Sequence, residues 1–361
     1  MDFTRLIVFI LGIAVVSATI LSAIHTFVLP RSANVLITRI VFRTVRRVFE
    51  LRLRRAQTYA DRDRIMALYA PFGLLALPFA WLVLVLIGYM GMFRALGIGS
   101  WYEAFRTSGS SLLTLGFAAV DGLWLTMLAF SEAAIGLVLV ALLIAYLPTM
   151  YAAFQRRETE VTKLEVRAGS PPSALEMIAR FHRLHGFDGL GPLWATWETW
   201  FTDVEESHTS LAALVFFRSP QPEHSWVTAA GTVLDTAAMI NSAIDTPRDI
   251  RADLCIRAGY LALRHIADFF RVPYNADPKP DDPISLSREE FEAACDDLAG
   301  RGIPLKPDRD RAWRDFAGWR VNYDTVLLAL AALTMAPYAP WSSDRSILPV
   351  RRARARSVIS E

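Results

Sequence analysis

The sequence has little of what most metal-binding and catalytic proteins display. Only two cysteines, Cys255 and Cys295, occur in 361 residues, and they form neither a CxxC pair nor a cluster with histidines. A disulfide framework and a zinc site are therefore not predicted. Glu205 and His208 have the spacing of half a di-iron helix motif, but the chain has no second Glu-x-x-His. Because no Ser/His/Asp or Cys/His arrangement is recognisable either, we expect neither an enzyme nor a bound metal or other cofactor.

Two further patterns are absent. No segment of the second half alternates apolar and polar residues as a half-buried strand does, and Gly186, Gly189 and Gly191 do not follow a strand. The net charge is only +2, so the chain is not a polyelectrolyte and we expect no nucleic-acid partner. The sequence therefore predicts an all-α protein without a dinucleotide-binding domain.

Apolar sequence, by contrast, is abundant, because 53% of the residues are hydrophobic. Three runs, at about 6–29, 68–93 and 123–151, are long enough to cross a hydrocarbon core of about 30 Å. The first run could also be a signal peptide, but it exceeds the roughly 7–15 apolar residues that such a segment has. We therefore predict three transmembrane helices.

Arginines are concentrated after the first run, between positions 31 and 64. Because positive residues stay on the cytoplasmic side, this cluster and Arg156–Arg157 place the N-terminus outside and the C-terminal half inside. The almost exclusive use of arginine as the basic residue is typical of a GC-rich bacterial genome. We therefore expect a multi-pass protein of a bacterial inner membrane.

Residues 34–56 show helical amphipathicity. Apolar side chains fall on one face of the expected helix, at Ile37, Val41, Val45 and Val48. A helix of this kind can lie on anionic lipids of the inner leaflet, with basic, lipid-facing residues at Arg39, Arg43, Arg46 and Arg47. The alternative is a basic linker that serves only as a topology signal.

A short polar segment, residues 101–122, separates the second and third apolar runs. Trp101 and Tyr102 suit a membrane interface, and the following Glu103–Leu113 is too short to span a bilayer and too polar to lie in lipid. The economical solution is a re-entrant helix, protected at membrane depth by protein or by a water-filled cavity.

The residues after this expected helix, Thr114, Leu115, Gly116 and Phe117, follow a T-x-G-aromatic pattern, and Gly136 lies in the middle of the third run. With this order of elements, residues 66–155 resemble the pore module of two-transmembrane potassium channels. The resemblance implies a homotetramer with K⁺ as the permeant ion, a selectivity filter of backbone carbonyls from Thr114 to Ala118, and a hinge at Gly136.

The chain departs from that family where the filter ends. The family continues with glycine and usually aspartate, whereas this chain has Ala118 and Ala119. The conformation of the second filter glycine costs a residue with a Cβ about 1–2 kcal/mol. Two function hypotheses follow: a potassium channel-like protein whose cytoplasmic domain gates or anchors the pore, and a non-conducting membrane scaffold or sensor that retains the fold. A plain hairpin of two helices is the alternative to the pore loop itself.

Glu132 is the only formal charge within the third run. A carboxyl group in a membrane is expensive and is by default a functional candidate. It could act in permeation or gating, hydrogen-bond the back of the pore helix, or pair with Arg106.

We expect five parts along the chain: a first transmembrane helix at 1–30, a basic amphipathic cytoplasmic segment at 31–65, the pore module at 66–155, a helical cytoplasmic domain at 156–345 and a basic disordered tail at 346–361. The cytoplasmic domain has an unknown ligand or protein partner. Its helical patterns cover residues 173–186, 192–218, 224–245, 248–272, 287–300 and 308–335. Trp194, Trp197 and Trp200 recur every third residue and are interpreted as core.

Overall fold

The computed structural model describes residues 2–27, 36–53, 56 and 58–345. Regular structure in these residues is helical, apart from an isolated bridge between Ile244 and Leu305, which confirms the all-α prediction. Contacts divide the chain into two compact units, Met1–Ala152 and Ala153–Glu361. The expected disordered tail lies outside the described residues.

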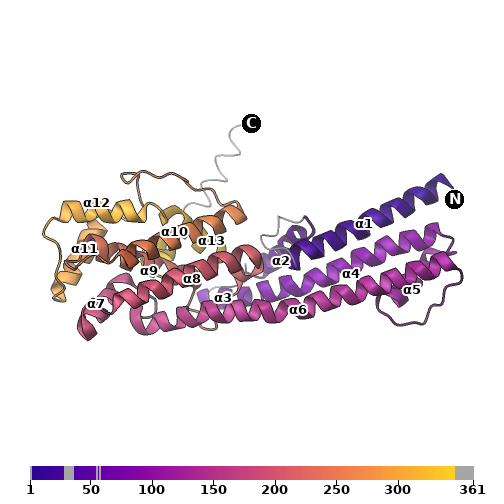
Figure 1. The fold of residues 1–361 in the computed structure, drawn as a ribbon, viewed down its shortest axis with the longest axis horizontal. Helices are drawn as coiled ribbons and strands as arrows, with labels where there is room; N and C mark the ends of the chain where they lie inside the picture. The colour runs from indigo at the N-terminus through magenta and orange to yellow at the C-terminus, as the bar shows by residue number, and fades with distance from the viewer. Residues whose placement is uncertain (1, 28–35, 54–55, 57, 346–361) are drawn as a thin grey trace. The chain divides into compact units, whose positions relative to one another are not determined.

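The α-helices follow one another along the chain as drawn in Figure 1. Those of the first unit are α1 Phe3–Phe27, α2 Leu36–Leu53, α3 Tyr59–Ala67, α4 Tyr69–Ala95 and α5 Trp101–Leu112. Helix α6, Leu123–Ala168, contributes to both units. Those of the second unit are α7 Ala174–His185, α8 Leu190–Ser210, α9 Trp226–Ser242, α10 Ile250–Phe270, α11 Arg288–Gly300, α12 Arg309–Arg320 and α13 Asp324–Thr334, with short 3₁₀ turns at Ala212–Phe216 and Ser343–Arg345.

Among the described residues, three stretches of helix are long and apolar enough to cross a membrane: Phe3–Phe27, Asp61–Ala95 and Leu123–Ala168. They agree with the three predicted spans and indicate a multi-pass membrane protein. The helix that contains the third run extends well beyond that run, because α6 continues through Pro148 to Ala168. Proline removes one backbone donor and bends a helix, but it ends the helix only if nothing stabilises the next turns. Here those turns are stabilised by burying Val161, Leu164 and Ala168 in the core of the second unit.

Helices α1 and α4 pack closely along their lengths (Figure 1). A Cβ placed on Gly12 would lie 2.6 Å from the carbonyl oxygen of Gly88, so the absence of both side chains allows the two backbones to approach. Trp81, which is fully buried, donates a hydrogen bond of 3.2 Å from Nε1 to the hydroxyl of Ser22. These contacts fix α1 against α4, which in turn supports α5.

Helix α2 packs against the start of α4. The ring of Phe42 fills the space over Gly73, and Ile37 and Val41 join the hydrophobic core of the first unit. The apolar face predicted for lipid contact is therefore partly used for packing against protein, because these side chains find apolar partners on α1 and α4. Val48, on the expected apolar face, is 60% exposed.

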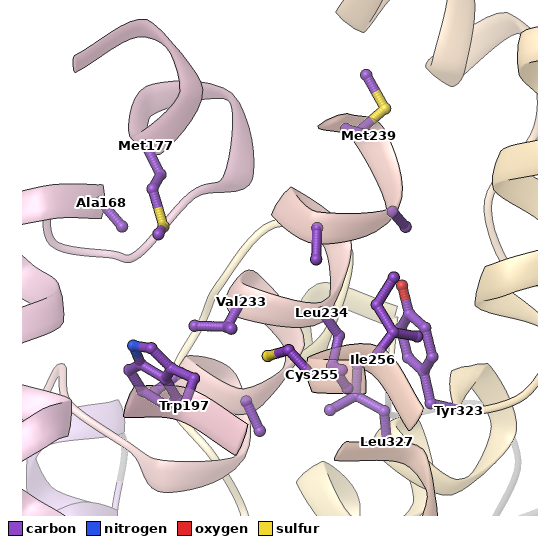
Figure 2. Close-up of a cluster of buried hydrophobic side chains, with 14 of the residues drawn as sticks. Ala168, Met177, Trp197, Val233, Leu234, Met239, Cys255, Ile256, Tyr323 and Leu327 are labelled. Atoms are coloured by element: carbon purple, nitrogen blue, oxygen red, sulfur yellow. The ribbon is translucent and has the colours of Figure 1, made fainter. Parts of the chain in front are cut away.

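The second unit has a continuous hydrophobic core centred on α9, in which nearly every side chain is buried. Figure 2 shows part of this core, with Trp197, Leu234, Cys255 and Leu327 gathered from four different helices. Trp194, Trp197 and Trp200 are at most 4% exposed, which confirms their interpretation as core.

Two of the predicted helices in this unit are divided. The pattern at 192–218 becomes α8 and a 3₁₀ turn that separate at Leu211, and the pattern at 308–335 becomes α12 and α13 with a break at 321–323. At the second break Tyr323 is fully buried, and its hydroxyl donates a hydrogen bond of 2.8 Å to Asp235. The other helical patterns match single helices, and the capping box of Ser287 and Glu290 at the start of α11 is confirmed.

Candidate functional site

The candidate site consists of α5 and the segment 113–122 that connects it to α6. The sequence starts α5 firmly, because Ser100 and Glu103 form a capping box: the Ser100 hydroxyl accepts from the Glu103 N–H at 3.1 Å, and the Glu103 carboxylate accepts from the Ser100 N–H at 2.9 Å. Ala104, Thr107, Ser108 and Leu112 form a buried face of α5.

Ser108 connects α5 to both neighbouring long helices. Its hydroxyl lies 3.2 Å from the carbonyl oxygen of Leu86 in α4 and also donates a short hydrogen bond to Glu132 in α6. Glu132 is completely buried, and its second carboxyl oxygen has no hydrogen-bond partner among the described residues. Of the alternatives for Glu132, the hydrogen bond to the back of the short helix is therefore observed. A role in permeation or gating stays a prediction.

Gly136 lies where the end of α5 meets α6. A Cβ at this position would be only 2.2 Å from the carbonyl oxygen of Leu112, so a side chain cannot be accommodated without moving α5. Helix α6 passes through Gly136 without interruption. Close packing against α5 thus explains why residue 136 is glycine. The predicted hinge at Gly136 stays a prediction.

The segment after α5 is attached to it through Ser110. The Ser110 carbonyl oxygen accepts from the N–H of Leu115 at 2.8 Å, and its hydroxyl accepts from the N–H of Ala118 at 3.1 Å. Thr114 and Gly116 have positive φ values of 54° and 73°, whereas Ala118 does not. A β-branched residue such as Thr114 rarely adopts this conformation, which is stored strain of the kind found at functional sites.

The predicted filter residues Thr114, Leu115, Gly116 and Phe117 are exposed in a single chain, and Ala118 is half-buried. Arg106, the other proposed partner of Glu132, lies elsewhere. Its guanidinium is over the rings of Tyr102 and Phe117, at 5.9 and 5.7 Å from their centroids. The structure thus brings the predicted filter next to an arginine that sequence reasoning considered only as an ion-pair partner.

The predicted lipid-facing arginines all belong to α2. Arg43 and Arg47 are exposed, while Arg39 and Arg46 are half-buried, and Arg46 forms an ion pair of 3.0 Å with Glu50. Their interaction with lipid stays a prediction.

Arg157 has a role that sequence analysis missed. The sequence indicates a cytoplasmic topology signal at this position, yet the side chain of Arg157 is buried between α6, α8 and the turn that follows. The guanidinium donates to the carbonyl oxygens of Leu214 and Phe217 at 2.8 and 2.7 Å, and it lies 3.2 Å from Nε2 of His208. Burial, with the neighbouring charge of Arg157, holds the pKa of His208 well below its ordinary value. The sequence signal for this role of Arg157 is that a charged residue occupies a position where the helical pattern predicts a buried apolar side chain.

A second buried charge cluster joins distant parts of the same unit. Arg320 donates to Asp235 and to Asp324, and Asp324 also accepts hydrogen bonds from the backbone and hydroxyl of Ser285. All of these groups are paired, so the cluster serves to hold α9, α12 and α13 together.

The half di-iron motif does not assemble. Glu205 accepts through Oε1 from Nδ1 of His265 at 2.7 Å, while His208 lies in the buried cluster of Arg157. Within the described residues, no group of three or more potential ligands could hold a metal ion. Comparison of the sequence with protein-family models, with curated proteins and with solved structures gives no match in any of the three.

Proposed function

We propose that the protein is a potassium channel-like membrane protein in which four copies surround a cation pore, with residues 101–122 as the re-entrant pore segment. The observation that carries the proposal is how far α5 extends alongside α6. Helix α5 begins soon after the end of α4, and its last residue, Leu112, lies against Gly136.

The lengths of these elements suit a segment that enters a membrane and leaves on the same side. Gly136 is thirteen residues beyond the start of α6, which is about 20 Å along the helix axis. The ten residues from 113 to 122 return the chain to that start, and extended chain covers at most about 3.3–3.6 Å per residue, so ten residues are enough. In a plain hairpin of two helices, the connecting segment would not need to run back alongside α6 as far as Gly136.

The C-terminal end of α5 carries partial negative charge and lies beside the predicted filter, since the carbonyl oxygens of Ser110 and Ser111 accept from the N–H groups of Leu115 and Thr114. Thr114, Leu115 and Gly116 bond to α5 through their N–H groups and are exposed in one chain, so other copies can approach them. A filter of carbonyl rings needs four such loops, which is the reason for proposing a homotetramer.

The remaining parts fit around this pore. Residues 153–345 would form the cytoplasmic domain that gates or anchors it, through an unknown ligand or protein partner. The exposed arginines Arg43 and Arg47 of α2 would face anionic lipids at the cytoplasmic surface. Bacterial inner-membrane location and an outside N-terminus complete the proposal.

The test is potassium flux through the purified full-length protein in lipid vesicles, together with its oligomeric state in detergent by native mass spectrometry. We expect a tetramer with weak or poorly selective potassium flux, because Ala118 and Ala119 replace the usual glycine and aspartate. Thr114→Ala should reduce the flux by removing an inner-site oxygen. Thr126→Ala is the matched control, because Thr126 is a half-buried threonine of α6 outside the filter whose hydroxyl donates to the carbonyl oxygen of Gly122.

The double variant Ala118→Gly, Ala119→Asp should raise potassium selectivity, because glycine adopts backbone conformations that alanine resists. A monomer or dimer in which neither the wild type nor this double variant passes potassium would contradict the pore. The second candidate is a non-conducting scaffold or sensor, which is favoured by the replacement of the family's glycine and aspartate. A monomer or dimer without potassium flux would support this candidate.

A further inference from the structure

Arg106 is an exposed charged residue on the short helix of the candidate site. Its side chain projects from the side of α5 opposite to the buried residues Ala104 and Ser108. The guanidinium carbon lies 5.7 Å from the ring centroid of Phe117, a predicted filter residue, and 5.9 Å from that of Tyr102. These two rings are the partners that the described residues supply for this charge.

The position of Arg106 along α5 places constraints on what surrounds it. It is five residues beyond Trp101, which is about 7.5 Å deeper along the helix if α5 enters the membrane at that end. Arginine facing lipid at depth is costly, and such residues almost always face water or the protein interior. A cation–π contact compensates for only a small part of that cost. Because Arg106 is exposed in one chain, the environment that suits it is the water-filled entrance between copies.

We propose that Arg106 is a selectivity-determining residue of this pore, which repels cations at the outer end of the filter and favours anions there. This inference rests on the proposed function. In a tetramer four guanidinium groups would stand beside the four Phe117 rings, and rings of arginine or lysine are the devices by which pores select anions. The nearest acid in the connecting segment, Asp121, is exposed and forms no ion pair with Arg106 among the described residues.

A purely structural role for Arg106 makes a different prediction. In that case the guanidinium would only hold Phe117 and the connecting segment against α5, and any substitution that loses the cation–π contact would disturb the filter. Glutamine and glutamate both lose that contact, so they would have the same effect. A charge effect, by contrast, follows the sign of the side chain: lysine retains it, glutamine removes it and glutamate reverses it.

The experiment compares potassium and chloride flux in vesicles that contain the full-length wild type, Arg106→Lys, Arg106→Gln or Arg106→Glu. We expect lysine to behave as the wild type, glutamine to raise potassium flux roughly 3- to 10-fold, and glutamate to raise it further, with chloride flux changing in the opposite order. The difference should shrink at high salt, because the charges are screened. Arg5→Gln is the matched control, since Arg5 is an exposed arginine on α1.

Three results would overturn the inference. Equal loss of flux in the glutamine and glutamate variants would assign Arg106 a structural role. Unchanged potassium and chloride flux in all three variants would show that Arg106 does not determine selectivity, although the protein still forms a pore. Absence of flux of either ion in the wild type and in every variant would overturn the pore and this inference together.

Discussion

At Gly136 the helix α6 carries no side chain, and the carbonyl oxygen of Leu112 occupies the space that a Cβ would need. We therefore predict that Gly136→Ala pushes the end of α5 away from α6. Overpacking of this kind costs about 1–3 kcal/mol, so the purified protein in detergent should lose its folded state at a lower temperature. Fluorescence-detected size-exclusion chromatography after heating measures this.

Gly109, on α5 itself, provides the matched control. A Cβ there would meet its nearest neighbour, a methyl group of Leu86, at an ordinary distance of 3.9 Å. Because alanine favours a helix over glycine by up to about 1 kcal/mol, Gly109→Ala should leave the protein as stable or make it more so. Equal melting of Gly136→Ala and the wild type would show that α5 does not pack where we describe it.

The buried imidazole of His208 leads to a prediction about pH. Its Nε2 accepts from Arg157, which requires the neutral ring, and burial keeps its pKa well below the ordinary value of about 6.5. His208 therefore becomes protonated near pH 6.5 in the unfolded chain but stays neutral at that pH in the folded chain. The stabilising effect of the neutral ring is complete above pH 6.5 and decreases by about 1.4 kcal/mol per pH unit below it, until the folded ring is protonated.

Urea unfolding of the second unit at pH 7.5, 6.5 and 5.5 measures this effect. His208→Gln lacks the titrating ring, so its free energy of unfolding should fall less between pH 6.5 and 5.5 than that of the wild type. The relevant quantity is the difference between the two proteins, because all other titrating groups are shared. Parallel curves for the two proteins would mean that His208 is accessible to protons in the folded state.

At the scale of helices, periodicity predicted where apolar faces lie better than where helices end. The continuation of α6 beyond the third apolar run was not predicted, because the turns after Pro148 are stabilised by contacts with residues far away in sequence, which periodicity does not reveal. The break at 321–323 was missed for a similar reason. Helix-compatible residues there give way to a turn that places Tyr323 and Arg320 on Asp235, 88 and 85 positions earlier.

The last part of α6 leads to a prediction about how the second unit folds. Val161, Leu164 and Ala168 belong to its core, and the carbonyl oxygen of Arg157 accepts from the indole N–H of Trp200 at 3.1 Å. Residues 153–345 should therefore fold alone as a water-soluble, helical fragment. Residues 170–345 lack these turns and should be less stable by at least about 3 kcal/mol, since each buried valine or leucine contributes about 1.5–3 kcal/mol.

Circular dichroism during urea unfolding of the two fragments tests this prediction. Fragment 153–345 should show a cooperative transition at the higher urea concentration, and fragment 170–345 should unfold earlier or aggregate. Identical midpoints would show that the end of α6 is a linker and not part of the core. A substantial β signal, or recovery of fragment 153–345 only in detergent, would count against the second unit as a separate soluble domain.

For the whole molecule, composition and run length were sufficient to predict the helical class and three candidate spans, because both depend on local sequence. The surroundings of the candidate site were only partly predictable. A hydrogen bond between Glu132 and the back of the short helix was among the alternatives, because a carboxyl group in an apolar run needs a polar partner, and the structure supplies Ser108. The contact between the guanidinium of Arg106 and the ring of Phe117 was not predicted, because it depends on how the connecting segment folds back on α5.

The orientation of the chain in the membrane is a prediction for the whole molecule. The described part of α2 carries five arginines opposed only by Glu50, so this side should be cytoplasmic. Exposed positions 52 and 121 lie before and after the span formed by α4. In a background with alanine at both native cysteines, an impermeant maleimide should label Asp121→Cys in intact cells and label Arg52→Cys only after permeabilisation. The reverse pattern would invert the topology, and labelling of both positions in intact cells would mean that α4 does not cross the membrane, which would also remove the basis for the re-entrant segment.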